Sequence, residues 1–140
     1  MMVFVDTWAW VALALKRDQH HDAAKVQHQT FRQERRRYVT SDFVLNELIT
    51  QLYPLLPSPQ AQSFIGAILT AGDAGEYAIV HVTPPQFRRA WELRQKYHDK
   101  PGISFVDFTS IVIMQEMGLT DVFTGDAHFR EVNLGFQLFP

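Results

Sequence analysis

Short segments with strand character alternate with longer helical segments along this chain, and this alternation constrains the fold more than any other feature. Five segments are rich in β-branched and aromatic side chains: residues 3–5, 38–41, 77–82, 122–124 and, as a short edge strand, 136–138. Six helical segments lie between them, at residues 8–15, 22–37, 43–53, 58–72, 84–100 and 104–117. Strands and helices that alternate in this way build a parallel sheet with helices on both faces. We therefore expect one doubly wound α/β domain over residues 1–140.

The composition agrees with a packed domain. The chain has 140 residues, of which 46% are hydrophobic and 13% aromatic, enough for one sizeable core. The absence of cysteine excludes disulfides and thiolate metal sites. No apolar run is long enough to cross a bilayer, and residues 1–6 lack the basic start of a signal peptide. We expect a cytoplasmic protein that does not enter the membrane.

Two carboxylates lie within two residues after the ends of predicted strands. Asp6 comes after residues 3–5, and Asp126 comes after residues 122–124 with Gly125 between them. In an open parallel sheet, ligands bind beyond the carboxyl ends of the strands. Both side chains would meet there if the first and fourth strands are neighbours. Alternatives stay open for each residue: Asp6 could be only a helix N-cap, and Asp126 only a turn residue.

Two further carboxylates lie on predicted helices. Asp107 shares one helical face with Ile103, Ile111 and Met114, so it is expected on the inward stripe near the start of its helix, where Ser104 could be the cap. Glu47 lies at the border of the apolar stripe of its own helix, from which a long side chain could reach the same crevice. Four converging carboxylates need a compensating cation, and oxygen ligands without sulfur favour Mg²⁺ or Mn²⁺. That cation predicts phosphoryl chemistry.

Other chemistries find no support in the sequence. No glycine-rich phosphate loop follows a strand, and no nucleophile elbow of the Gly-x-Ser-x-Gly type occurs. His128, two residues after Asp126, is interpreted as a turn or packing residue rather than a phosphate contact. Trp8, Trp10 and Trp91 are interpreted as core residues, because each lies in an apolar helical pattern.

The charge pattern leaves two interpretations open. The net charge is −2, and the four carboxylates account for −4, so the rest of the chain carries +2. Basic side chains gather in two groups: Arg32, Arg35, Arg36 and Arg37 in the first, and Arg88, Arg89, Arg94, Lys96 and Lys100 in the second. Each group is either a solvated helix face or part of a weak basic rim around the acidic centre.

Taken in order, four motifs resemble those of PIN-domain ribonucleases. They are Val3-Phe4-Val5-Asp6-Thr7, Ser41-Asp42-Phe43-Val44-Leu45-Asn46-Glu47, Ser104-Phe105-Val106-Asp107 and Phe123-Thr124-Gly125-Asp126-Ala127-His128-Phe129. The small size and the ending at residues 135–140 are similar to VapC-type toxins of toxin-antitoxin pairs. One departure is Trp8, where many members carry a small residue.

The resemblance implies a three-layer α/β/α sandwich with a mainly parallel sheet of four to five strands. It also implies Mg²⁺- or Mn²⁺-dependent cleavage of RNA, a homodimer, and inhibition by a small cognate antitoxin. Asp6, Glu47, Asp107 and Asp126 take the catalytic and metal-binding positions, with Thr7 and Thr124 as supporting hydroxyls. Asp121 competes with Asp126 for the fourth position, but it precedes its strand, so Asp126 is preferred.

Two other functions remain as alternatives. A PIN-like module could bind RNA or a protein without catalysis, although a binder of polyanions gains nothing from clustered negative charge. A metal-dependent DNA nuclease would need the same carboxylates. Cleavage assays on RNA and DNA, with and without Mg²⁺, separate these functions.

Overall fold

A five-stranded parallel sheet forms the centre of the computed structural model, which describes residues 1–140. The strands are β1 (Met2–Val5), β2 (Arg37–Ser41), β3 (Ala78–Val80), β4 (Asp121–Phe123) and β5 (Gln137–Phe139). Their spatial order is β3-β2-β1-β4-β5, and every neighbouring pair is parallel. The predicted sheet is therefore confirmed, with the C-terminal segment as its edge strand.

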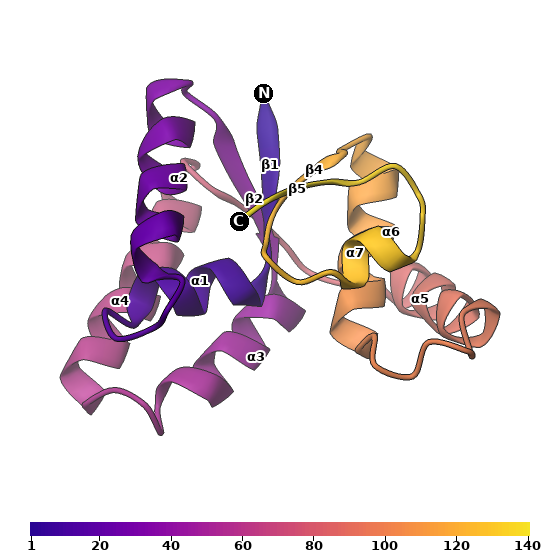
Figure 1. Ribbon diagram of the computed structural model, residues 1–140, viewed down its shortest axis with the longest axis horizontal. Helices are drawn as coiled ribbons and strands as arrows, with labels where there is room; N and C mark the ends of the chain where they lie inside the picture. The colour runs from indigo at the N-terminus through magenta and orange to yellow at the C-terminus, as the bar shows by residue number, and fades with distance from the viewer.

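Helices cover both faces of this sheet (Figure 1). They are α1 (Thr7–Ala14), α2 (His21–Gln33), α3 (Asp42–Leu52), α4 (Ser58–Asp73), α5 (Pro84–Lys96), α6 (Phe105–Met117) and α7 (His128–Glu131). In Figure 1, α1, α2 and α4 lie on one side of the sheet, and α5, α6 and α7 lie on the other. The helix α3 lies below the strands and contacts both α1 and α6. This arrangement is the predicted three-layer α/β/α sandwich.

The core is centred on β1, because this strand lies in the middle of the sheet and is covered on both faces. Val3, Phe4 and Val5 have no exposed surface. Such a strand has no solvent face and so contains apolar residues in succession rather than in alternation. On the face of the sheet that α6 covers, Phe108 and Ile111 of this helix are also fully buried. The apolar packing fixes the directions in which the strand ends point.

Strand register brings the predicted site elements together. Val5 of β1 pairs with Phe123 of β4, which confirms that the first and fourth strands are neighbours. The amide of Asp6 donates to the Phe123 carbonyl at 3.2 Å, so the backbones stay together just where the strands end. The segments that begin at Asp6 and Thr124 therefore leave the sheet side by side, at its carboxyl edge.

Several elements differ from the sequence-based expectation. The second helix ends at Gln33 rather than Arg37, because Arg35 adopts a left-handed backbone (φ 57°) and the amide of Arg36 donates back to the Phe31 carbonyl. The third strand is limited to Ala78–Val80. The short helix α7 was not expected, since four residues give no periodic signal. The expected end of α6 at Met117 is confirmed, and Gly118 follows it with a left-handed φ of 67°.

The structure decides between the two interpretations of the first arginine group. Residues 32–37 run from the end of α2 into the first residue of β2, so they lie at the amino edge of the sheet, opposite Asp6, and form no part of a rim around the acidic centre. One core expectation is wrong: Trp91 is 48% exposed on α5, whereas Trp10 is buried as expected. No helix is long and apolar enough to cross a membrane.

Candidate metal centre

Asp6 lies at the carboxyl end of β1 with only 3% of its surface exposed. It occupies the N-cap position of α1, but its side chain makes no capping hydrogen bond. Its Oδ2 instead accepts a hydrogen bond of 2.9 Å from the Thr124 hydroxyl, which follows β4. The N-cap alternative therefore does not describe this side chain. Asp6 is a buried carboxylate held by the neighbouring strand's end.

Asp107 lies in the first turn of α6 and is 6% exposed. Its Oδ2 accepts from the Ser104 amide at 3.2 Å, and the Ser104 hydroxyl accepts from the Asp107 amide at 3.1 Å. This reciprocal capping box confirms Ser104 as the cap. Because α6 starts at the carboxyl edge of the sheet, the cap holds the Asp107 carboxyl group close to Asp6.

Asp126 lies in the loop between β4 and α7 and is half-buried. Its amide donates to the Thr124 hydroxyl at 3.0 Å, the same hydroxyl that donates to Asp6. Its Oδ1 accepts from the His128 amide at 3.0 Å, an Asx turn that agrees with the turn alternative for this residue. Thr124, fully buried, thus links Asp6 to the Asp126 loop.

His128 is the residue that sequence reasoning missed. Its Nδ1 lies 3.0 Å from Asp107 Oδ2 and 3.1 Å from Asp126 Oδ1. Asp107, Asp126 and His128 offer ligand atoms that all lie within 4.8 Å of one another, a group that could hold a metal ion. The spacing of Asp126 and His128 was visible in the sequence, but the contact with Asp107 depends on the fold.

Burial and mutual repulsion set the electrostatics of the site. Burial, together with the charge of Asp107, raises the pKa of Asp6 to about 7. Burial also raises the pKa of Asp107, although the hydrogen bond from His128 opposes that rise. Burial lowers the pKa of His128, but its hydrogen bond to Asp107 and the nearby carboxylate charges outweigh burial, so its pKa is raised overall. No Lys or Arg side chain pairs with these carboxylates, so His128 is the only basic group in contact with them.

Glu47 is less closely tied to this group than the three aspartates. It is half-buried on α3, the helix below the strands, and it makes no hydrogen bond or ion pair. The nearby Asp42 belongs elsewhere: its carboxylate accepts from the Val82 amide at 3.0 Å and pairs with His81 at 3.4 Å. Glu47 is therefore a free carboxylate on an adjacent helix.

The large side chain of Trp8 is accommodated by a glycine. Gly125 lies against the indole so closely that a Cβ there would stand 2.3 Å from Trp8 Cζ2. The indole also packs on His20, with ring centroids 5.0 Å apart. Trp8 therefore closes over the turn that leads to Asp126, and it leaves the carboxylates of Asp6 and Asp107 in their hydrogen-bonded positions.

Asp121 lies at the other end of β4. It is the first residue of that strand, and its Oδ2 pairs with the Arg36 guanidinium at 2.7 Å. Arg36, 10% exposed, also donates to the Met2 carbonyl. Asp121 therefore compensates a largely buried arginine at the amino edge of the sheet, away from Asp6.

Comparison with known proteins places the chain in a family. The PIN-domain family model matches residues 3–134. VapC20 of Mycobacterium tuberculosis, named a 23S rRNA-specific endonuclease, is 30% identical over 128 residues, which cover 91% of this chain and 92% of VapC20. The crystal structure of VapC20, described as a sarcin-ricin loop cleaving toxin, has a TM-score of 0.82 to this chain, with 96% of each chain covered.

More distant structures share the fold. The structure of VapBC2 of Rickettsia felis, bound to a DNA fragment from its promoter, includes a chain with 18% identity and a TM-score of 0.72, covering 99% of this chain and 97% of that one. FitAcB of Neisseria gonorrhoeae reaches 16% identity and a TM-score of 0.66, covering 100% and 97%. With a family model that spans nearly the whole chain and a relative 30% identical over most of it, this protein belongs to the PIN-domain family.

Proposed function

We propose that this protein is an endoribonuclease that uses Mg²⁺ or Mn²⁺, with Asp6, Glu47, Asp107 and Asp126 as its catalytic carboxylates. The observation that carries the proposal is the convergence of three aspartates from β1, α6 and the β4–α7 loop at one edge of the sheet, two of them with raised pKa values. Carboxylates held together at this cost are expected at a functional site.

The residues present fit a hard divalent cation. They offer oxygen atoms and no sulfur, the ligand type that Mg²⁺ and Mn²⁺ prefer. The hydroxyl oxygen of Thr7, beside Asp6, is buried and has no hydrogen-bond partner, as suits a group that contacts a bound water. Asp6, Asp107 and Asp126 would hold the ion, and Glu47, from α3, would act directly or through water. The single domain over residues 1–140 would then contain the whole site.

A bound ion of this kind supplies activation of a water molecule and stabilisation of negative charge on the scissile phosphate. The chain's own residues supply orientation. Thr124 holds the Asp6 carboxylate by one hydrogen bond and the Asp126 loop by another. The capping box fixes Asp107 on a rigid helix start. Burial of Asp6 and Asp107 keeps competing solvent away from their carboxylates.

The substrate proposal follows from VapC20, which is 30% identical to this chain. VapC20 is named a 23S rRNA-specific endonuclease and described as a toxin that cleaves the sarcin-ricin loop. Ribosomal RNA is therefore the first substrate to test for this chain. From the resemblance to VapC-type toxins we also propose a toxin that acts in the cytoplasm as a homodimer and is silenced by a small cognate antitoxin.

The deciding experiment incubates purified protein with total RNA, intact ribosomes and single-stranded DNA, each with EDTA, Mg²⁺ or Mn²⁺. Cleavage of RNA only with divalent ions supports the proposal. Cleavage of DNA alone would point to a DNA nuclease, and binding without any cleavage would point to a non-catalytic module. Discrete 23S rRNA fragments would extend the likeness to VapC20.

Asp121→Asn is expected to weaken the fold without reducing cleavage. The substitution leaves the Arg36 guanidinium without its charged partner, so the free energy of unfolding should fall by about 1 to 3 kcal/mol. Urea unfolding measures this loss, and RNA cleavage per folded molecule should stay within about twofold of wild type. Loss of cleavage as severe as that of Asp107→Asn would show that Asp126 is the wrong fourth carboxylate.

A further inference from the structure

We propose that His128 is a positioning residue of the metal centre: one ring nitrogen holds the carboxylates of Asp107 and Asp126 at the spacing that a cation needs. The inference rests on the proposed metal site and adds a residue to it that the four-carboxylate motif does not contain. His128 acts through the two aspartates and needs no contact of its own with the ion.

The contact joins two separate elements. Asp107 belongs to α6, and Asp126 belongs to the loop that follows β4. The His128 Nδ1 lies 3.0 Å from Asp107 Oδ2 and 3.1 Å from Asp126 Oδ1, so a single donor reaches both carboxylates. No hydrogen bond joins Asp107 directly to Asp126 or to its loop backbone. Without the ring, only their repulsion would act between these two carboxylates.

In each of the two carboxylates, one oxygen accepts hydrogen bonds and the other is free to bind a cation. Asp107 Oδ2 accepts hydrogen bonds from the Ser104 amide and from the His128 ring. Asp126 Oδ1 accepts a hydrogen bond from the His128 amide, and the ring Nδ1 lies 3.1 Å from this same oxygen. Asp107 Oδ1 and Asp126 Oδ2 accept no hydrogen bond. Each carboxylate thus uses one oxygen for its orientation and offers the other to a cation. Ligands oriented in this way by an outer hydrogen bond are common in metal sites.

The ring needs no positive charge for this task. Since both partners of Nδ1 are carboxylate oxygens, which only accept, the proton lies on Nδ1, and a neutral ring with that tautomer makes the same contact. The charged and polar groups that face the ring are Asp107 from α6, Asp126 from its own loop and Glu131 from α7. The proposal therefore concerns the position of one donor atom at constant pH.

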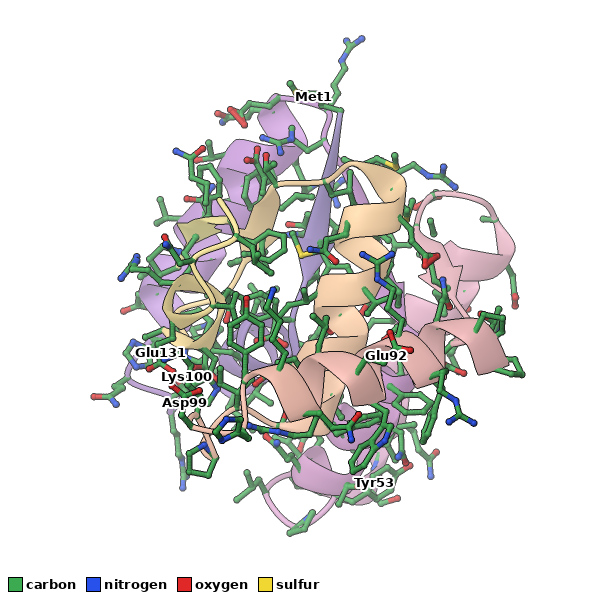
Figure 2. The ribbon with its side chains drawn as sticks, turned by 90° about the vertical axis from the view of Figure 1, so that its right-hand side faces the viewer. Met1, Tyr53, Glu92, Asp99, Lys100 and Glu131 are labelled. Atoms are coloured by element: carbon green, nitrogen blue, oxygen red, sulfur yellow. The ribbon has the colours of Figure 1, made fainter.

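The loop between α5 and α6 holds the ring in place. A Cβ at Gly102 would lie 3.8 Å from His128 Nε2, so this loop lies directly against the ring. Tyr97, at the start of the loop, donates its hydroxyl proton to the Val132 carbonyl just after α7. In the view of Figure 2, Asp99 and Lys100 of the loop lie on the same side of the molecule as Glu131 at the end of α7. The ring, whose side chain is 28% exposed, therefore lies against a loop that is hydrogen-bonded to the segment after α7.

The test compares three substitutions that differ in the position of the donor. The side-chain amide of Asn places nitrogen where His carries Nδ1, whereas Gln places it near Nε2, and Ala has no donor. Mn²⁺ binding to the purified full chain is measured by calorimetry at one pH, and the melting temperature of each variant in EDTA reports its fold. His81→Ala is the matched control, because His81 also pairs with an aspartate but lies 81% exposed outside the site.

We expect His128→Ala and His128→Gln to weaken Mn²⁺ binding about 10- to 100-fold, and His128→Asn to retain most of it. His81→Ala should bind Mn²⁺ like wild type. Two results would overturn the inference: unchanged or tighter Mn²⁺ binding by the Ala and Gln variants, the tighter case meaning that the ring competes with the ion, or Asn as weak as Ala. If wild type binds no Mn²⁺, the metal site itself fails, whereas normal wild-type binding with unaffected variants removes only the role of His128.

Discussion

Asp6→Asn is expected to lower divalent-dependent RNA cleavage by about 10³-fold, equivalent to about 4 kcal/mol of transition-state stabilisation. The substitution preserves shape and leaves an oxygen that can accept the hydrogen bond from Thr124, so the local structure should persist. It removes the negative charge from the most buried of the four carboxylates. The loss should therefore appear in cleavage and in metal affinity rather than in folding.

The measurement is the initial rate of RNA cleavage at several Mn²⁺ concentrations, with circular dichroism to show that the variant is folded. Asp22→Asn is the matched control, because Asp22 lies exposed on the first turn of α2. The Asp22→Asn protein should cleave RNA like wild type. Asp107→Asn should be about as damaging as Asp6→Asn. A folded Asp6→Asn protein that cleaves RNA within tenfold of wild type would remove Asp6 from the proposed site.

The strand ends could be predicted from the sequence because they depend on local signals. Residues 3–5 form a continuous apolar run, as a strand buried on both faces requires, and Asp6 follows it at once. Ser104 and Asp107 form the capping box of a helix whose inward stripe was visible in its periodicity. Parallel topology then brings these ends to one edge.

The role of His128 could not be predicted in the same way. Its spacing from Asp126 is a local feature that fits an ordinary turn, and the turn indeed exists. Its second partner, Asp107, precedes it by a helix and a strand, and only the packing of α7 against α6 brings the ring to that carboxylate. One sequence contains no signal for that contact.

The location of basic side chains also depends on tertiary structure. A run of arginines at residues 32–37 indicates positive charge but not the end of the sheet that carries it. After the left-handed turn at Arg35 the run leads into β2, whose first residue is Arg37, so these residues lie at the amino edge. Arg94 in the second group donates to the carbonyls of Tyr97, Lys100 and Ile103 and is thus occupied with the loop before α6.

Without metal, the buried carboxyl group of Asp6 should make the stability of the protein fall as the pH rises. Its pKa is about 7 in the folded protein against an ordinary value of 3.8, so between these values the folded state keeps a proton that the unfolded state has released. Unfolding free energy then decreases with rising pH. The full effect of Asp6 by pH 8 is about 4 kcal/mol.

Asp6→Asn removes the ionisable group at position 6 and leaves the neighbouring groups in place. The comparison with wild type therefore isolates the contribution of Asp6 to the pH dependence of stability. In EDTA, the two proteins should melt at similar temperatures near pH 4, and by pH 8 the variant should melt about 10 °C above wild type. Added Mn²⁺ should then reverse the order, since a ligand at a hundred times its Kd stabilises wild type by about 2.7 kcal/mol, whereas the variant binds it weakly. If the difference in melting temperature between the two proteins stays constant from pH 4 to pH 8, the pKa of Asp6 is not raised in the folded protein. The proposed shortage of positive charge around Asp6 would then be wrong.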